Sequence, residues 1–421
     1  MFFTGFTSID EYLLDESNIP VNNDLVLPDS VDLIEASEHG YIGRVQSEEE
    51  DLYTFVFKNN DGTNTMRVYS HPVKYIDCKG IIKDITLDLN ALSNGNYQTA
   101  NNNIKTTFSK QLSEGIFLEY NDIVISMIPK LKTTNNSEAS LSSDKKKVTY
   151  LYGDKTTLEY SLTYMGFKED IVISEYTGQN DFSFTLITNG LTLVEENGSY
   201  YLTDTKGNIK ATIGDIIVFT ADEHNNTMGY MTYETINANK EYELSIHIDE
   251  DFLCDKSTLY PIRIDPTIEI NSSSGSGAIE DVTINPNYVF SGTSSSIHVG
   301  RQPAGSITRT LMRFPNLSLI KYSGNNIPLA YVEIRDLMCQ GDEDITVYCH
   351  TYNSSSPTWS ESGNTSWASV GSAYIGTTLD YNLISYGEGI GTGSGESHRY
   401  RFNITNLAQK WANEKEVRQR E

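Results

Sequence analysis

The sequence has few cysteines, few basic side chains and no long apolar segment. Four cysteines in 421 residues are too few for a disulfide framework. The apolar runs fall well short of the roughly 18 residues that a membrane-spanning helix needs, so we expect no membrane insertion. The chain carries 31 Lys and Arg against 57 Asp and Glu, which gives a net charge of −26. That sign disfavours the binding of phosphates, and we expect no nucleic-acid partner.

Motifs of the common enzyme families are also missing. The sequence has no GxSxG elbow, no HExxH helix, no GxxxxGKS/T phosphate loop and no GxGxxG turn. The seven histidines are scattered, and His224 lies among carboxylates in a turn-like stretch. A solvated loop explains His224 better than a general base does, because no nucleophile or orienting partner can be named. We therefore expect a protein that is not an enzyme and has no catalytic residues.

Aromatic and alternating apolar residues are plentiful, with 27 Tyr and 15 Phe in the chain. From about residue 52 onward apolar and polar residues alternate with a period of two, as in Phe182, Phe184 and Leu186, which is typical of β-strands. Turn dipeptides separate these stretches, among them Asp61-Gly62, Asn94-Gly95 and Asn189-Gly190. The pattern predicts an all-β protein built as antiparallel β-sandwiches rather than as a parallel βαβ sheet.

Shifts in composition divide the chain into four parts. Residues 1–34 form an acidic leader that we expect to be weakly ordered, and residues 35–269 form a β-rich scaffold region. This region is either one lobe or two lobes split near residues 131–147, which carry few large apolar groups. Residues 270–277 are a flexible Ser/Gly linker by composition, and residues 278–421 form a separate β domain.

One short helix is predicted near the C-terminus. Ile404, Leu407, Ala408 and Trp411 follow the i, i+3, i+4, i+7 spacing of an amphipathic helix. Asn403 or Thr405 is available as its N-cap.

Aromatic and Arg side chains in the last domain are the candidate ligand-binding residues. Sugars stack on Trp or Tyr rings while carboxylates and Arg bind their hydroxyls or acidic groups. Trp359 and Trp367 are candidate platforms, and the alternative is that they pack against the end of the sandwich. Arg309 and Arg313 lie on one face of an extended strand, where they could clamp a sugar carboxylate. Ion pairs with Asp or Glu inside the fold are the alternative for these two.

Acidic clusters raise the question of a bound cation. Glu280 and Asp281 offer the oxygen ligands that Ca²⁺ prefers, so a structural Ca²⁺ at this position is a candidate. No acidic cluster has the DxDxDG spacing, and solvated turns explain most such clusters in so acidic a chain.

Six short motifs occur in order through the last domain, and together they resemble the DNRLRE domain. They are Asp281–Ile284, Ile297–Gly300, Arg309–Phe314, Ala330–Ile334, the loop Trp359–Glu361 with Thr365–Trp367, and Phe402–Thr405 followed by Trp411. The resemblance implies a jelly-roll-like β-sandwich of carbohydrate-binding type in a secreted bacterial protein. Trp359, Glu361 and Trp367 of the matching loop join Arg309 and Arg313 as the predicted ligand-binding set. The family continues past the helix into a final strand that residues 414–421 do not supply, so we expect a truncated domain.

Residues 53–88 and 148–270 resemble the region that precedes such domains in large wall-associated and Rhs-type surface proteins. The matching stretches are Phe57–Thr63, His71–Tyr75, Glu169–Val172 and Tyr260–Thr267. This resemblance implies an extracellular or cell-surface location and a longer multidomain chain, although residues 1–6 lack the features of a signal peptide.

The sequence therefore predicts a non-catalytic carbohydrate-binding or adhesion module of a secreted or cell-surface bacterial protein. Its expected partner is a polysaccharide or cell-surface glycan. One alternative is a structural scaffold or spacer of a larger Rhs-type or wall-associated toxin protein. The other is a polysaccharide-degrading enzyme, which requires two carboxylates about 5–10 Å apart in an aromatic-lined cleft.

Overall fold

The computed structural model describes fourteen segments of the chain between residues 25 and 413. They are residues 25–31, 33–131, 137–196, 199–221, 227–238, 240–270, 279–287, 297–301, 305–314, 324, 326–335, 344–352, 375–385 and 399–413. The chain divides into two compact units, Met1–Val68 and Tyr69–Glu421. This boundary falls inside residues 35–269, which are predicted from the sequence to form one scaffold region.

The first unit contains a short helix and a three-stranded antiparallel sheet. Its elements are α1 (Leu33–His39), β1 (Tyr41–Arg44), a 3-10 turn (Gln46–Glu48), β2 (Thr54–Asn59) and β3 (Asn64–Val68). Phe55 and Phe57 are fully buried, and the Tyr41 ring stacks on Phe57 at 4.3 Å between centroids. The predicted turn at Asp61-Gly62 joins β2 to β3, with Gly62 at a φ of +90°.

One large antiparallel sheet of the second unit has eight strands among the described residues. In spatial order these are β21 (Tyr230–Asn237), β22 (Glu241–His247), β15 (Asp181–Ile187), β10 (Ile123–Pro129), β9 (Ile116–Tyr120), β8 (Lys105–Phe108), β7 (Tyr97–Asn101) and β6 (Thr86–Ala91). A separate hairpin, β4 (Lys74–Ile76) with β5 (Ile82–Asp84), precedes it, and the 3-10 turn Leu112–Glu114 lies between β8 and β9.

A second antiparallel sheet has eleven strands in the part of the chain that the structure describes. Its main path runs through β11 (Ser140–Leu141), β12 (Lys147–Leu151), β13 (Thr156–Leu162), β14 (Gly166–Ile173), β24 (Thr267–Ile270), β18 (Ile209–Ile213), β17 (Ser199–Thr203) and β16 (Thr192–Glu196). Beside this path lie β19 (Ile217–Phe219), β20 (Thr227–Met228) and β23 (Ile262–Asp265), and α2 (Glu250–Cys254) follows β22.

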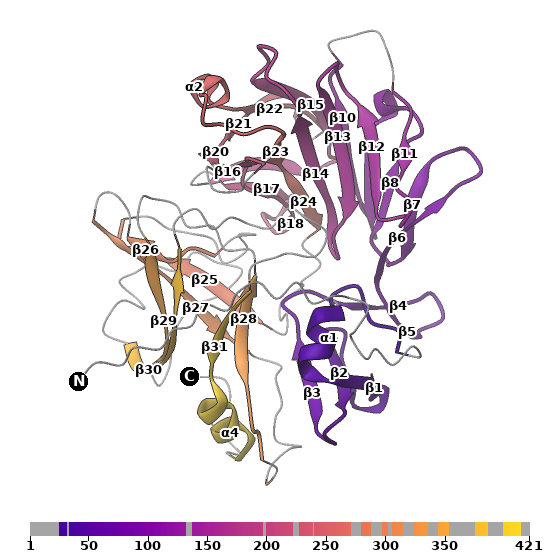
Figure 1. Cartoon of the computed structure of the whole chain (residues 1–421). Coiled ribbons are helices and arrows are strands. Elements are labelled where there is room, and N and C mark those ends of the chain that lie inside the picture. The colour runs from indigo at the N-terminus through magenta and orange to yellow at the C-terminus, as the bar shows by residue number, and fades with distance from the viewer. Residues whose placement is uncertain are drawn as a thin grey trace. The chain divides into compact units, whose positions relative to one another are not determined.

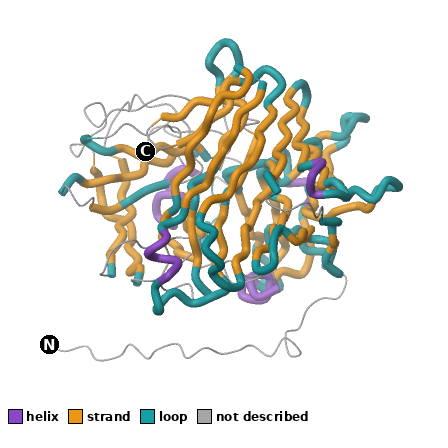
Figure 2. Tube along the Cα trace, turned by 90° about the horizontal axis from the view of Figure 1, so that it is seen from above, coloured by secondary structure: helices purple, strands orange, loops and turns teal. Residues whose placement is uncertain are grey.

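The two large sheets pack face to face around one hydrophobic core (Figure 1). Phe182 and Phe184 of β15 enter this core from the eight-stranded sheet, and Leu158 and Phe167 enter it from the eleven-stranded sheet. Viewed at 90° to Figure 1, long strands lie side by side (Figure 2). Burial of these inner faces is the main source of stability for such a sandwich.

The strands on either side of the polar segment 131–147 belong to the same sandwich. Strand β10 before it pairs directly with β15 after it, with Met127 opposite Leu186. Asn189-Gly190 has the positive φ angles that the sequence predicts, 50° and 115°. The turn does not close a hairpin, however, because it leads from β15 in one sheet to β16 in the other.

Glu169 on β14 places a fully buried carboxyl group in the core. One oxygen of this group accepts a hydrogen bond from the Tyr160 hydroxyl, and its other oxygen has no hydrogen-bond partner among the described residues. Burial raises the pKa of Glu169 to about 8, and the charge of Asp170 adds to the effect, against the Tyr160 hydrogen bond. The group is therefore uncharged at neutral pH, which suits its apolar surroundings.

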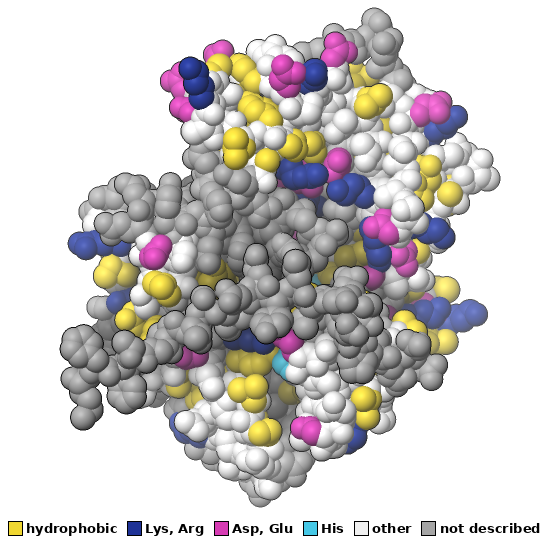
Figure 3. All heavy atoms as spheres, in the orientation of Figure 1, with side chains coloured by type: hydrophobic (Ala, Val, Ile, Leu, Met, Phe, Trp, Pro, Cys, Tyr) yellow, Lys and Arg dark blue, Asp and Glu magenta, His cyan; other side chains and the backbone are white. Residues whose placement is uncertain are grey.

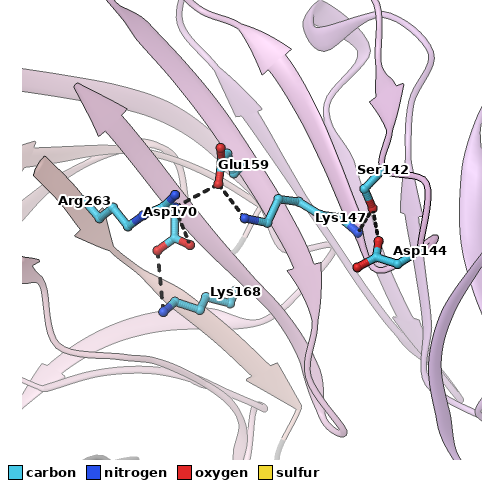
Figure 4. A network of polar contacts seen from close by, with 7 residues as sticks. All are labelled: Ser142, Asp144, Lys147, Glu159, Lys168, Asp170 and Arg263. Carbon is cyan, nitrogen blue, oxygen red and sulfur yellow. Dashed lines mark hydrogen bonds and ion pairs between the residues drawn. The ribbon is translucent and has the colours of Figure 1, made fainter. Parts of the chain in front are cut away.

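Charged side chains form a network on the opposite face of the same sheet (Figure 4). The Lys147 Nζ and the Arg263 guanidinium lie 2.7 and 2.8 Å from one oxygen of Glu159. Arg263 also contacts Asp170, which in turn lies 3.5 Å from Lys168. Desolvation raises the pKa of Glu159, but the hydrogen bonds from Lys147 and Arg263 outweigh it, so the pKa is lowered overall.

The C-terminal region is built from antiparallel strands, as predicted. The described strands are β25 (Glu280–Ile284), β26 (Gly300–Arg301), β27 (Ile307–Arg313), β28 (Tyr331–Arg335), β29 (Ile345–Tyr352), β30 (Ile375–Ile384) and β31 (Arg399–Asn403). Ile384 and Phe402 are buried together with the inner side of Val347, so the β28–β31 and β29–β30 pairs share a core. Val282 and Ile284 pack with Tyr352 in a second cluster.

The predicted C-terminal helix is confirmed as α4 (Thr405–Asn413). Its apolar side buries Leu407 and Trp411, and the Asn403 side chain accepts from the Thr405 N–H at its start. No helix among the described residues is long and apolar enough to cross a membrane. The all-β fold with one short C-terminal helix is thus as expected from the sequence. The Ser/Gly linker lies outside the described residues except for Ile270, which ends β24.

Replacing Glu169 by Gln removes a pH dependence of stability. Below pH 4.5 the Glu169 carboxyl is protonated in both the folded and the unfolded chain. Between pH 4.5 and about 8 the unfolded chain releases this proton and the folded chain keeps it, so the free energy of unfolding falls as pH rises. In denaturant unfolding at a series of pH values, the stability of Glu169→Gln relative to wild type should rise by on the order of 5 kcal/mol across this window.

Glu159→Gln provides the matched control of opposite sign. The lowered pKa of Glu159 makes its charged form stabilising above the ordinary pKa, so this variant loses stability at neutral pH and approaches wild type in acid. Parallel pH profiles for Glu169→Gln and wild type would contradict the buried, neutral carboxyl.

Candidate functional site

The structure places four of the predicted site residues on two paired strands. Arg309 and Arg313 lie on β27, and Glu280 and Asp281 lie on the neighbouring β25. The other predicted residues, Trp359, Glu361 and Trp367, lie outside the described residues, as does His224.

Arg313 and Glu280 form an ion pair with each other. They stand directly opposite in the register of β25 and β27, and the Arg313 Nε donates to a Glu280 carboxylate oxygen. Arg309 lies further along, opposite Ile284. Of the two alternatives for Arg313, the structure therefore has the ion pair inside the fold.

The candidate cation site shares this carboxylate. Glu280 is engaged by Arg313, while Asp281 stands opposite Met312, and burial raises the pKa of Asp281 to about 6. A raised carboxyl pKa opposes the charged form that would bind Ca²⁺. Within the described residues no group of three or more His, Cys, Asp or Glu side chains is placed to hold a metal ion.

An exposed row of rings, here called the tyrosine stripe, lies on the outer side of the β29–β30 pair. It consists of Tyr348, Tyr381 and His350. Tyr348 stands opposite Tyr381 with 5.8 Å between ring centroids, and the His350 ring lies 6.1 Å from Tyr348. The two tyrosines are 56% and 61% exposed. The Thr378 hydroxyl lies 3.2 Å from the His350 Nδ1 and fixes that end of the row.

Strand alternation accounts for the tyrosine stripe. Val347 and Cys349 point into the core shared with β31. Tyr348 and His350 alternate with them along β29 and therefore point outward. Neighbouring aromatic rings on a shallow sheet face can stack on the apolar C–H face of a sugar ring, with Thr and His as hydrogen-bonding groups beside it. These residues could not be recognised as a site from the sequence, because the pairing of Tyr348 with Tyr381 depends on the register of distant strands.

The chain is similar to long nucleases of Bacillus. It is 24% identical over 249 residues to the tRNA(Glu)-specific nuclease WapA of Bacillus subtilis subsp. natto, to the tRNA nuclease WapA of Bacillus subtilis and to the tRNA3(Ser)-specific nuclease WapA of Bacillus spizizenii. The match takes in 55% of this chain and 11% of each relative. No family model matches the chain. No solved structure matches it.

These relatives overturn two expectations from the sequence. A protein that is not an enzyme and a protein with no nucleic-acid partner were both expected, yet all three relatives are named as tRNA nucleases. Both expectations came from the charge and motifs of 421 residues. The region that matches makes up 11% of each relative. The net charge and the motifs of this chain therefore carry no information about the remaining length of such a nuclease.

The pair of Arg313 and Glu280 predicts a measurable coupling across β25 and β27. In a double-mutant cycle of Glu280→Gln and Arg313→Gln, the free energies of unfolding should show a coupling of about 1 kcal/mol, as for a partly exposed ion pair. Arg309→Gln, on the same strand, is the control and should show no coupling to Glu280→Gln. A coupling near zero for Arg313 would contradict the pairing.

Proposed function

We propose that this chain is a rigid β-scaffold segment of a long WapA-like protein that acts on tRNA. The observation that carries the proposal is the continuous core between the two large sheets, which binds residues from Leu89 to Ile270 into one body. The chain is similar to only 11% of each of three much longer nucleases. This favours a structural role for the sandwich within a larger protein.

The surface of the chain suits a scaffold that stays in solution and does not associate with other copies of itself. Lys, Arg, Asp and Glu side chains are interspersed with hydrophobic ones on the face that Figure 3 shows. The net charge of −26 adds long-range repulsion between copies. The resemblance to wall-associated and Rhs-type proteins favours an extracellular or cell-surface location.

A replacement experiment tests the scaffold directly. The region of Bacillus subtilis tRNA nuclease WapA that matches is exchanged for the corresponding region of this chain, and tRNA cleavage and surface display of the hybrid are measured. Both should be retained, because a scaffold contributes its folded shape rather than its individual surface residues. A hybrid that folds but loses display or cleavage would contradict the proposal.

Two substitutions make this experiment specific. Phe182→Ala removes a fully buried ring from the core and should cost about 3–5 kcal/mol of stability, so a hybrid carrying it should lose display. Leu151→Ala changes a side chain that is 68% exposed and should leave the hybrid unchanged.

A second candidate function is sugar binding by the C-terminal domain, which the tyrosine stripe favours. Exposed paired rings are costly to leave in water, and stacking on a sugar recovers part of that cost. The resemblance to the DNRLRE domain supports the same class of ligand. Trp359, Glu361, Trp367 and Arg309 remain predicted contributors to this binding.

Glycan-array binding of the chain tests this second function. Replacement of Tyr348 and Tyr381 by Ser should abolish binding, whereas the unfolding midpoint should barely change, because both rings lie outside the core. Leu383→Ser, on the same outer face and 59% exposed, is the matched control and should retain binding. Undiminished binding by the double variant would contradict a role for the stripe.

A further inference from the structure

A hydrogen-bonded row of three side chains crosses three strands on the outer face of the eight-stranded sheet. Asp181 of β15 stands opposite His247 of β22, and Thr232 lies on the adjacent β21. The His247 Nδ1 is 2.6 Å from Asp181 Oδ1, and its Nε2 is 2.8 Å from Thr232 Oγ1. A hydroxyl, an imidazole and a carboxylate are thus joined in sequence.

The direction of these hydrogen bonds sets the roles of the three groups. The Asp181 carboxylate can only accept, so the His247 Nδ1 carries the proton and Nε2 is left to accept from the Thr232 hydroxyl. A hydroxyl bonded to a base that is itself oriented by a carboxylate is the arrangement that activates a nucleophile in hydrolytic enzymes.

Neighbouring side chains hold this arrangement in place and leave it accessible. The Tyr230 ring stacks on His247 at 4.7 Å and 21°, which limits rotation of the imidazole. The hydroxyls of Ser183 and Ser245 bond to each other rather than to His247. The side chains of His247 and Asp181 are 24% and 52% exposed, so a small molecule in solution can reach them.

The backbone beside Thr232 offers a donor for a developing negative charge. The amide and carbonyl of one residue in an antiparallel strand point to the same side, and alternate residues share that side. The Gly229 N–H donates to the Ile216 carbonyl, on the side of β21 away from β22, so Met231 and the Tyr233 N–H also point to that side. Strand β21 is the edge of its sheet among the described residues. The Tyr233 N–H, on the residue after Thr232, is therefore the backbone donor that we infer would face a developing oxyanion.

The charges on this face select the class of substrate. Glu234 and Glu243 are cross-strand neighbours on the same face as Thr232, and Lys130 there is paired with Glu243 at 2.5 Å. Phosphodiesters would be repelled, whereas uncharged acyl compounds would not. We propose that Thr232 and His247, positioned by Asp181, form a hydrolytic site for small uncharged carboxylic esters.

The reaction needs only the ester and water. The Thr232 Oγ1 bonds to the acyl carbon while its proton passes to the His247 Nε2. His247 then gives that proton to the departing alcohol as the ester bond breaks. Water, deprotonated by His247, attacks the acyl-threonine, which releases the carboxylic acid and returns the proton to the Thr232 oxygen.

Acetyl transfer from p-nitrophenyl acetate to the full chain tests the proposal. Release of p-nitrophenolate gives the rate, and peptide mass spectrometry locates the acetyl group, which we expect on Thr232. Thr232→Val and His247→Gln should each lower the rate about 100-fold or more and remove this acetylation. Thr232→Ser should remain active, and Ser245→Ala, which changes a hydroxyl that does not contact His247, should match wild type.

Asp181 is tested separately as a positioning residue. Asp181→Asn should lower the rate, and Asp181→Glu should restore part of it, a rescue that a purely structural role would not produce. Unfolding curves that match wild type confirm that each surface variant is folded. Acetylation confined to other side chains, or a wild-type rate in Thr232→Val, would overturn the proposal.

Discussion

The fold depends on the burial of two facing sheet surfaces against each other, because neither large sheet can cover its apolar side alone. Phe184 from one sheet and Leu158 from the other belong to the same fully buried cluster. The core accepts a carboxyl group only in its neutral form, held by a single hydrogen bond from Tyr160 to Glu169. Packing of this kind fixes the register of the strands in these two sheets, and with it the positions of their outward side chains.

The proposed sugar-binding site and the proposed hydrolytic site both consist of outward-facing side chains. In β29 the residues that alternate with the buried positions form the tyrosine stripe, and in β21 and β22 they place Thr232 beside His247. The same alternation that builds the core thus presents fixed sets of polar and aromatic groups on rigid strands. A scaffold role for the sandwich and chemistry on its outer faces are therefore compatible within one structure.

Local sequence patterns predicted many of the strands and the C-terminal helix. They did not predict which strands pair, because pairing joins residues that are distant in the sequence. Alternation in Phe182, Phe184 and Leu186 gave the correct strand, and helical spacing around Trp411 gave the correct helix, because both periods are properties of neighbouring residues. The path of the chain after Asn189-Gly190 depends on which sheet the next strand joins. Similarly, the sequence offers Arg313 and Glu280 only as separate candidates for two different sites, and their mutual pairing, like that of Asp181 with His247, follows only from the register.

Native-state hydrogen exchange on the full chain tests the shared core most directly. If burial between the two sheets holds both together, the slowest amides of β10 and β15 in one sheet and of β13 and β14 in the other should open with the same free energy, equal to that of global unfolding. Phe182→Ala should lower all of them by the same amount. Opening of one sheet at a clearly lower free energy, with the other still protected, would contradict a single core as the basis of the structure.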